Sequence, residues 1–356
     1  MSCGLNPRSR LVLAKLENSP GVDSGPTVGT DDLFVSMDSA GIKLGVTQVS
    51  NEPASPSGYE LPAAVATIKP SATYIIPLYG LGLSVGEPIL PKWLSVILAS
   101  CGYVDQSVSG GAEVTWVPDI IYPRNTNPAG TQTLPTDCTF TIYDYLARDG
   151  EIGNTGTKIL QAMVGCRVSQ IRFVLTVGQW AALEVDILGL SVMPTSVTTD
   201  LSSATLDTVR TDFVRCNAAQ SSLFLGSAVA LKSQSTTWTI DFGVTQEEGD
   251  TTEAGVATIG ARQCIVTGSM NPIQATANIG VYQSAQFDQT THGYSMAGRM
   301  TPEGQLVDNG YTIGIAAPST QIIFDYDTSG SVVRLPTTLK AVSADSTTSP
   351  ISLTLS

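Results

Sequence analysis

Apolar and polar residues alternate along many short segments of this chain, which is the period of strands with one buried face. In the clearest segment the apolar residues stand two apart, at Ile171, Phe173, Leu175 and Val177. A two-residue turn at 178–179 follows, and the alternation resumes over 182–190. Two alternating segments separated by so short a turn predict an antiparallel hairpin.

The same pattern predicts further strands and few helices. The other segments with strand-like periodicity are 30–49, 72–83, 138–145, 229–246, 256–269, 312–326, 332–342 and 351–355. Residues 194–222 are rich in Ser, Thr and Asp and are expected to form a connecting loop, while 278–292 fit either a helix or a loop. Many short strands that do not alternate with helices predict a mainly β fold, either a β-sandwich or a barrel.

One segment has helical periodicity. Its apolar residues fall on one face of a helix, at Trp93, Leu94, Ile97, Leu98 and Cys101. Pro91 suits the first helical turn and Gly102 suits the C-terminal stop. We therefore expect one flanking α-helix over 91–101 that covers one face of the sheet.

Breaker residues divide the chain into a central β domain with extensions. Residues 1–30 contain Pro- and Gly-rich turns and few apolar groups, so we expect an N-terminal arm there. The β domain is expected over 31–342, with 104–135 as a projecting loop or hairpin. The last segment, 343–356, ends in alternating apolar residues and is expected to form an edge strand.

A short internal similarity raises the question of a duplicated domain. Val164-Gly165-Cys166-Arg167 and Ile259-Gly260-Ala261-Arg262 both precede apolar strands. A match of four residues fits a duplication and also fits chance, so both interpretations stay open at this point.

Composition adds that the surface is acidic but poor in charge. Charged residues make up 14% of the 356 residues, against roughly 25% in average domains, and the formal net charge is -13. Neutral polar side chains suit surfaces that pack against neighbouring molecules, because burying a hydroxyl costs less than burying an ion. The acidity argues against a nucleic-acid-binding groove, although it permits a passage through which DNA slides without binding.

The cysteines and the absence of apolar stretches point to synthesis and folding in the cytoplasm. No two of the six cysteines are close enough for a zinc knuckle, and we expect reduced thiols in the core: Cys3, Cys101, Cys138, Cys166, Cys216 and Cys264. Residues 1–16 lack the apolar centre of a signal peptide, and no segment of about 20 apolar residues is present to cross a membrane.

One motif suggests a hydrolase. Gly82-Leu83-Ser84-Val85-Gly86 matches the nucleophile elbow, and His292 is the only histidine of the chain. An elbow needs a helix that begins at the serine, whereas Pro88 and Pro91 place the expected helix several residues later. The sequence therefore predicts no catalytic site and no enzyme.

Three weaker motifs fail in similar ways. Gly80-Leu81-Gly82 lacks the third glycine of a phosphate-binding loop. Asp325 to Gly330 resembles the start of a calcium loop, but Pro336 stands where the bidentate Glu should be, so a solvated turn between strands is expected. Glu247-Glu248-Gly249-Asp250 is expected to be a charged hairpin tip. No metal site or cofactor site is predicted.

A set of ordered motifs resembles the tail tube proteins of long-tailed bacteriophages. The first is the string Gly80-Leu81-Gly82, Gly86-Glu87-Pro88 and Trp93 to Gly102, in which a glycine-rich stretch leads through a proline into a helix. The regions that agree in order and spacing are Leu13 to Glu17 with Gly21 to Asp23, Tyr143 to Gly150, Gly165 to Arg167, and the hairpin over 178–189. The resemblance extends over roughly residues 8–190.

This resemblance implies a structural virion protein. Such subunits form a β-sandwich or barrel with a flanking helix and assemble into stacked rings, usually hexameric, around a tape-measure protein. The implied partners are further copies of the chain, the tape-measure protein, the tail terminator and the distal tail proteins, with transient passage of DNA. The implied location is the virion tail. We expect residues 1–30 and 104–135 to mediate the stacking of rings.

Two other classes remain open from the sequence. A terminator or baseplate hub of the same tail would share the fold. A β-rich surface adhesin would share the Ser/Thr-rich, acidic composition, but it should carry an export signal and exposed aromatic platforms.

Overall fold

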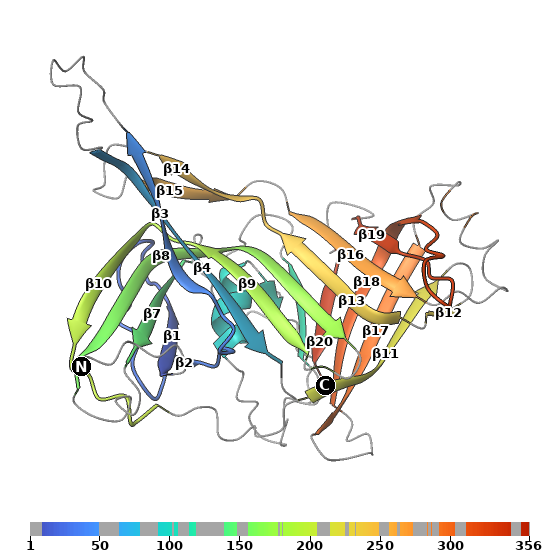
Figure 1. Cartoon of the computed structure of the whole chain (residues 1–356), viewed down its shortest axis with the longest axis horizontal. Helices are drawn as coiled ribbons and strands as arrows, with labels where there is room; N and C mark the ends of the chain where they lie inside the picture. The colour runs from blue at the N-terminus through green and yellow to red at the C-terminus, as the bar shows by residue number, and fades with distance from the viewer. Residues whose placement is uncertain are drawn as a thin grey trace.

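The chain folds into a mainly β protein, which confirms the fold class predicted from the hydrophobic pattern (Figure 1). The computed structural model describes residues 9–49, 64–78, 92–101, 103–105, 114–118, 139–147, 156–176, 179, 181–204, 214–224, 228–231, 233–248, 256–261, 264–272, 283, 286, 292–302, 311–342 and 350–355.

Eight strands of the N-terminal half form what we call the first unit. They are β1 (Arg10–Leu16), β2 (Asp32–Leu33), β3 (Gly41–Val49), β4 (Ala64–Pro77), β7 (Phe140–Leu146), β8 (Lys158–Thr176), β9 (Ala182–Leu188) and β10 (Ser191–Val197). All pairings are antiparallel and follow two orders, β2-β1-β7-β8-β10 and β3-β4-β9-β8. Strand β8 belongs to both orders, because β7 and β10 pair with its first half and β9 pairs with its second half.

The C-terminal half repeats this topology as a second unit. Its strands are β11 (Val214–Phe224), β12 (Ala228–Leu231), β13 (Ser233–Asp241), β16 (Ile265–Pro272), β17 (His292–Pro302), β18 (Tyr311–Phe324), β19 (Thr337–Ala341) and β20 (Ser352–Leu355). They pair in the orders β12-β11-β17-β18-β20 and β13-β16-β19-β18. Taken in chain order, each strand has the partners of its counterpart in the first unit. The four-residue sequence match does not mark this repeat, because Gly165 lies in β8 and Gly260 in β15 (Val256–Ala261), which are not counterparts.

The two units are joined edge to edge. Strand β13 pairs with the second half of β8, from Asp241 opposite Gln170 to Ser235 opposite Thr176. This joint produces one continuous sheet in the order β3-β4-β9-β8-β13-β16-β19-β18, which we call the long sheet. Figure 1 shows it running from the first unit to the second.

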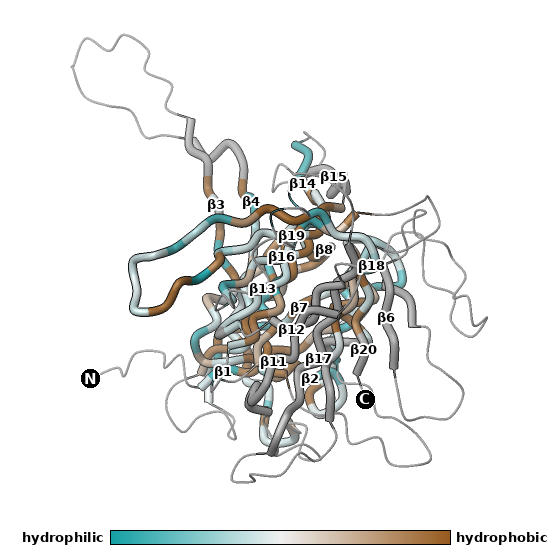
Figure 2. Tube along the Cα trace, turned by 90° about the vertical axis from the view of Figure 1, so that its right-hand side faces the viewer, coloured by the Kyte–Doolittle hydropathy of each residue, from teal (hydrophilic) through white to brown (hydrophobic). Residues whose placement is uncertain are grey.

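Two hairpins extend from corresponding places in the units. The far ends of β3 and β4 project beyond β9, and β14 (Val244–Glu248) with β15 projects from β13 and β16. Both lie on the same side of the molecule in the two views (Figures 1 and 2). A third hairpin, β5 (Tyr103–Asp105) with β6 (Val114–Pro118), pairs through β6 with β20 of the second unit.

A buried carboxylate fixes the point at which β8 changes partners. Gly165 has a φ of +64°, and a Cβ there would stand 2.4 Å from Leu190 Cδ1, so only glycine suits this position. The Gly165 N–H donates to Glu17 (2.8 Å), as do the hydroxyls of Thr139 (2.6 Å) and Thr141 (2.8 Å). Glu17 is 2% exposed. It therefore ties the N-terminal segment to β7 and to the bend in β8.

The helical segment differs from the one expected. Residues 92–100 are helical, with a π-helix, η1, over Trp93–Leu98. Four consecutive residues, 96–99, are buried, so η1 lies inside the core rather than covering a sheet with one face. Its buried residues belong to one apolar cluster with residues of β1, β4, β7, β8 and β9.

Three expectations about segment boundaries need correction. Residues 10–16 of the expected arm are strand β1, and Leu13 is fully buried. The expected loop over 194–222 contains the end of β10 and most of β11. Strand β20 is not an edge strand, because Leu353 and Leu355 pair with β18 on one side and with β6 on the other. Local sequence could not show these placements, because each depends on pairing with a strand that is distant in sequence.

Candidate assembly interface

The long sheet ends in two open edges. At one end, β3 pairs with β4 and with no other strand in the part of the chain that the structure describes. At the other end, β17 pairs with one edge of β18, and the last pair is His292 with Thr320. Beyond Thr320 no described strand takes that edge, while β19 continues along the opposite one. The Tyr326 hydroxyl near this edge accepts a hydrogen bond from Gln283 at 3.1 Å. A strand edge that no neighbouring strand covers can add a strand from another molecule.

The edge of β3 carries apolar side chains that lack cover. Ile42 pairs with Ala72, which faces the core and is 2% exposed, so Ile42, Leu44 and Val46 share that face of the sheet. Leu44 is nevertheless 46% exposed and Val46 is 47% exposed. Leu44 and Val46 therefore point to the same side of the sheet as the core residues, but they are exposed to solvent.

At the edge of β18, too, an apolar side chain on the core-facing side of the sheet is exposed to solvent. Ile322 and Phe324 face the core and are 5% and 9% exposed. Tyr326 continues the alternation on this face but is 45% exposed. Its ring stands edge-on to Phe324, with 5.8 Å between the ring centroids. An aromatic side chain therefore marks the end of this edge.

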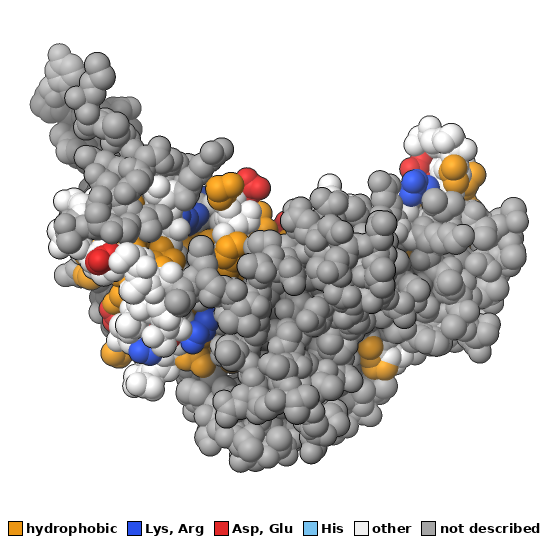
Figure 3. Space-filling model, turned by 90° about the horizontal axis from the view of Figure 1, so that it is seen from below, with side chains coloured by type: hydrophobic (Ala, Val, Ile, Leu, Met, Phe, Trp, Pro, Cys, Tyr) orange, Lys and Arg blue, Asp and Glu red, His pale blue; other side chains and the backbone are white. Residues whose placement is uncertain are grey.

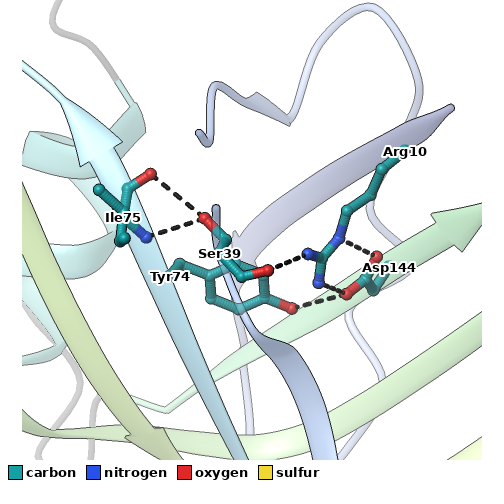
Figure 4. A network of polar contacts seen from close by, with 5 residues as sticks. All are labelled: Arg10, Ser39, Tyr74, Ile75 and Asp144. Atoms are coloured by element: carbon teal, nitrogen blue, oxygen red, sulfur yellow. Dashed lines mark hydrogen bonds and ion pairs between the residues drawn. The ribbon is translucent and has the colours of Figure 1, made fainter. Parts of the chain in front are cut away.

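A buried polar network holds the base of β3 in place (Figure 4). Arg10 of β1 forms an ion pair with Asp144 of β7, in which Nε donates to Oδ1 at 2.8 Å and Nη2 reaches Oδ2. Its Nη1 donates to the carbonyl oxygen of Ser39 at 2.9 Å. The Tyr74 hydroxyl donates to Asp144 at 3.1 Å, and the Ser39 hydroxyl accepts from the N–H of Ile75 at 2.9 Å. The network thus connects β1, β4 and β7 with the segment that enters β3.

Electrostatics and sterics both suit a structural role for this network. Burial, followed by the charge of Asp144, raises the pKa of Tyr74 well above its usual value. Burial acts to lower the pKa of Arg10, but the hydrogen bonds and charge of Asp144 outweigh it, so the pKa is raised. Gly41, the first residue of β3, has a φ of +73°, and a Cβ there would stand 1.8 Å from Arg10 Nη2. Arg10 therefore fills the space that a side chain at position 41 would need.

The solvent face of the long sheet carries many uncharged polar groups, together with charged residues such as Asp241 and Lys340 and the exposed Ile265 and Ile323. Examples of the uncharged groups from successive strands are Thr73, Gln170, Thr239, Thr267, Ser269, Thr338 and Gln321. Arg172 on this face pairs with Glu184 at 2.7 Å and with Asp186 at 3.3 Å, which offsets part of the charge. Figure 3 shows hydrophobic, basic and acidic side chains interspersed among the described residues on the face seen from below.

The motifs considered for catalysis or metal binding do not form a site within the described residues. The elbow at 82–86 and the glycines at 80–82 lie outside those residues, and His292 begins β17. The described part of the chain contains no cluster of three or more potential metal ligands. Glu247 and Glu248 are exposed at the end of β14, as the hairpin prediction requires, while residues 249 and 250 lie outside the description.

The segment 325–330 is a turn between β18 and β19, as predicted. The Asp327 carboxylate accepts hydrogen bonds from the Ser329 hydroxyl at 2.6 Å and from its N–H at 2.9 Å. These bonds lower the pKa of Asp327. This is the ordinary chemistry of an Asx turn and needs no bound cation.

Cys101, Cys166 and Cys264 are free thiols with different surroundings. Cys166 is buried and Cys101 is half-buried, which agrees with the expectation of core thiols, whereas Cys264 is exposed. Burial raises the pKa of Cys101 and Cys166 well above the usual value for a thiol.

The sequence did not reveal the edge residues. Ile42, Leu44 and Val46 have the alternation of any half-buried strand. That pattern states which side chains share a face but not whether a neighbouring strand covers them.

Comparisons with known proteins leave the interface as the main guide to function. No protein-family model matches the chain, and a search of curated proteins finds no match. The described part of the chain contains no helix long and apolar enough to span a bilayer.

Proposed function

We propose that this chain is a structural subunit that assembles with further copies of itself into stacked rings, forming the tail tube of a long-tailed bacteriophage. In this role the tube surrounds a tape-measure protein and later conducts DNA. Its other partners are the tail terminator and the distal tail proteins, and its location is the virion tail. The observation that carries the proposal is the long sheet, which ends in two open edges with uncovered apolar side chains on its core-facing side.

Two further features support a conduit. The solvent face of the long sheet is rich in hydroxyl and amide groups. Such a surface offers DNA phosphates little attraction, so DNA can pass without being held. The hairpins β3–β4 and β14–β15 project on one side of the molecule, where they can reach a neighbouring ring (Figure 2). The stacking role expected for residues 1–30 is restricted by the structure, because β1 and β2 are bound into the β domain.

Negative-stain electron microscopy of the purified chain tests this function. We expect tubes of uniform diameter that lengthen with protein concentration, because rings that stack by translation have no fixed end. Single rings that never stack would favour a terminator or hub. A chain that stays monomeric at every concentration would contradict the proposal.

A further inference from the structure

We infer that the hairpin β14–β15 is a clasp, which holds the second unit against the first at a fixed angle, and that the side-chain amide of Gln246 is the group that closes it. This device acts within one chain, so the inference does not depend on how copies meet. Figure 1 shows the clasp (Val244–Glu248 with Val256–Ala261) extending from the second unit back toward the first, where β15 lies against β4.

The clasp is not part of the long sheet. Among the described residues β14 pairs with β15 alone, so the two strands form a separate sheet. The chain leaves β13 through a turn at Gly243, which has a φ of +58° and donates its N–H to Asp241 Oδ1 at 2.8 Å. A two-stranded hairpin is only marginally stable by itself. Side chains must therefore attach the clasp to the rest of the molecule.

One face of β14 supplies these attachments. Val244, Gln246 and Glu248 share this face because they stand two residues apart. Val244 packs against the main apolar cluster. Gln246 donates to main-chain carbonyls of the first unit, and Glu248 forms an ion pair with Lys69 of β4 at 2.5 Å. Every residue of this face therefore has a partner outside the hairpin.

The Gln246 amide binds the place where the two strand orders of the first unit separate. Its Nε2 donates to the carbonyl oxygen of Pro70 in β4 at 2.9 Å and to that of Gly189, which follows β9, at 2.7 Å. An amide NH₂ has two N–H groups, one for each acceptor. The Gly189 N–H still bonds to Pro70, at 3.1 Å, whereas the next N–H, of Leu190, bonds to Val164 of β8. Gln246 therefore connects β4 and the end of β9 where the chain turns away from β4.

The amide is a better candidate than the ion pair for closing the clasp. The side chains of Lys69 and Glu248 are 38% and 58% exposed, and ion pairs on the surface contribute little. Gln246 is less exposed, and both of its acceptors are main-chain carbonyls at a strand junction. Without the amide, the Gly189 carbonyl loses this donor. We therefore assign the closing of the clasp to Gln246.

A second attachment matters because the joint between the units is a strand pair. The twist between paired strands varies from about −10° to −35°, so the pairing of β8 with β13 does not by itself set the angle between the units. The clasp attaches the second unit at Pro70 and Gly189, beyond the Asp241 end of that joint. Two separate attachments fix the angle, whereas one leaves it adjustable.

Hydrogen exchange of the full chain tests whether Gln246 closes the clasp. Gln246→Glu keeps the size of the side chain but replaces both N–H donors with an oxygen that repels the two carbonyls. We expect the backbone amides of 244–248 and 256–261 to exchange roughly tenfold faster, because the released hairpin opens readily. Peptides 10–16 and 337–341 should exchange as in the wild type, which shows that both units remain folded.

Glu248→Gln is the matched control, because it lies on the same face of β14 and removes only the surface ion pair. We expect it to change exchange in the clasp by less than about twofold. Wild-type exchange in Gln246→Glu would overturn the clasp. Equal effects of the two variants would overturn the assignment to Gln246.

Small-angle X-ray scattering of the unassembled chain, at low protein concentration, tests whether the clasp fixes the angle. Gln246→Glu is expected to broaden the distribution of distances between the units, while Glu248→Gln leaves it unchanged. Faster exchange with unchanged scattering would show that the hairpin opens without altering the angle, and would overturn the holding role.

One consequence for assembly rests on the proposed function. In a tube, the angle between the units sets the curvature of each chain, so Gln246→Glu tubes should vary in diameter under negative-stain electron microscopy, while Glu248→Gln tubes stay uniform. Uniform Gln246→Glu tubes would contradict this consequence. If neither the wild type nor the variants form tubes, the tail tube fails, whereas exchange and scattering still decide on the clasp.

Discussion

Replacing Arg10 with methionine is expected to destabilise the chain by about 3–5 kcal/mol, the usual cost of removing one partner of a buried ion pair. The Asp144 side chain is fully buried, and among the described residues the Tyr74 hydroxyl is the donor that this variant would keep. The variant also loses the bond from Arg10 to the Ser39 carbonyl, which holds the entry to β3. The midpoint of urea unfolding, followed by tryptophan fluorescence, measures the change.

The double variant Arg10→Met with Asp144→Leu is the control for this prediction. Removing both charges leaves no uncompensated ion, so a large part of the lost stability should return. A double variant as unstable as the sum of the two single variants would show that the pair acts through shape alone. A stable Arg10→Met variant would contradict the account of the network.

Replacing Glu17 with alanine is expected to destabilise the chain by about 3 kcal/mol, because it leaves several buried donors without an acceptor. The carboxylate accepts from two threonine hydroxyls, at positions 139 and 141, and from the N–H groups of Gly21 and Gly165. Losing these bonds releases the N-terminal segment from β7 and from the bend in β8. The same urea titration applies.

The variant Glu17→Gln separates acceptor chemistry from shape. Its amide keeps one oxygen, which can serve Thr141 and Gly165, but it places an NH₂ group where Gly21 and Thr139 donate. An intermediate loss is therefore expected. Equal stability of the Ala, Gln and wild-type chains would show that these hydrogen bonds contribute nothing to folding.

The strands were predictable wherever alternation was unbroken. The sequence predicted the hairpin of β8 and β9 over residues 171–190, because one face of the hairpin is buried and few residues separate the two strands. The first half of β8 was missed because the bend at Gly165 and the shift in register near Val168 break the two-residue period. Irregularities of this kind arise where a strand changes partners, which is a property of the whole fold rather than of local sequence.

The helix and the N-terminal segment were misplaced for a similar reason. Periodicity identified the apolar residues near Ile97 correctly, but it could not state that the core surrounds η1 on more than one side. The segment around Leu13 appeared to be an arm because turn residues follow it, whereas β7 and Glu17 bind it into the sheet. Long-range pairing outweighed the local signal in both cases.

The interface could not be predicted from sequence because the two units share pairings and not residues. By its pairings β3 corresponds to β13, yet the two strands share only alternating apolar residues. The repeat becomes visible once the pairings are known.

Hydrogen exchange of the backbone amides tests the central claim most directly. Assemblies are compared with the same chain kept unassembled at low protein concentration, using peptides that span 41–46, 321–327 and, as a reference, 191–197 on β10. The account predicts that exchange slows in both edge peptides on assembly, while the β10 peptide changes little. Unchanged exchange at both edges in assembled particles would contradict the claim that this protein works by joining the ends of its long sheet.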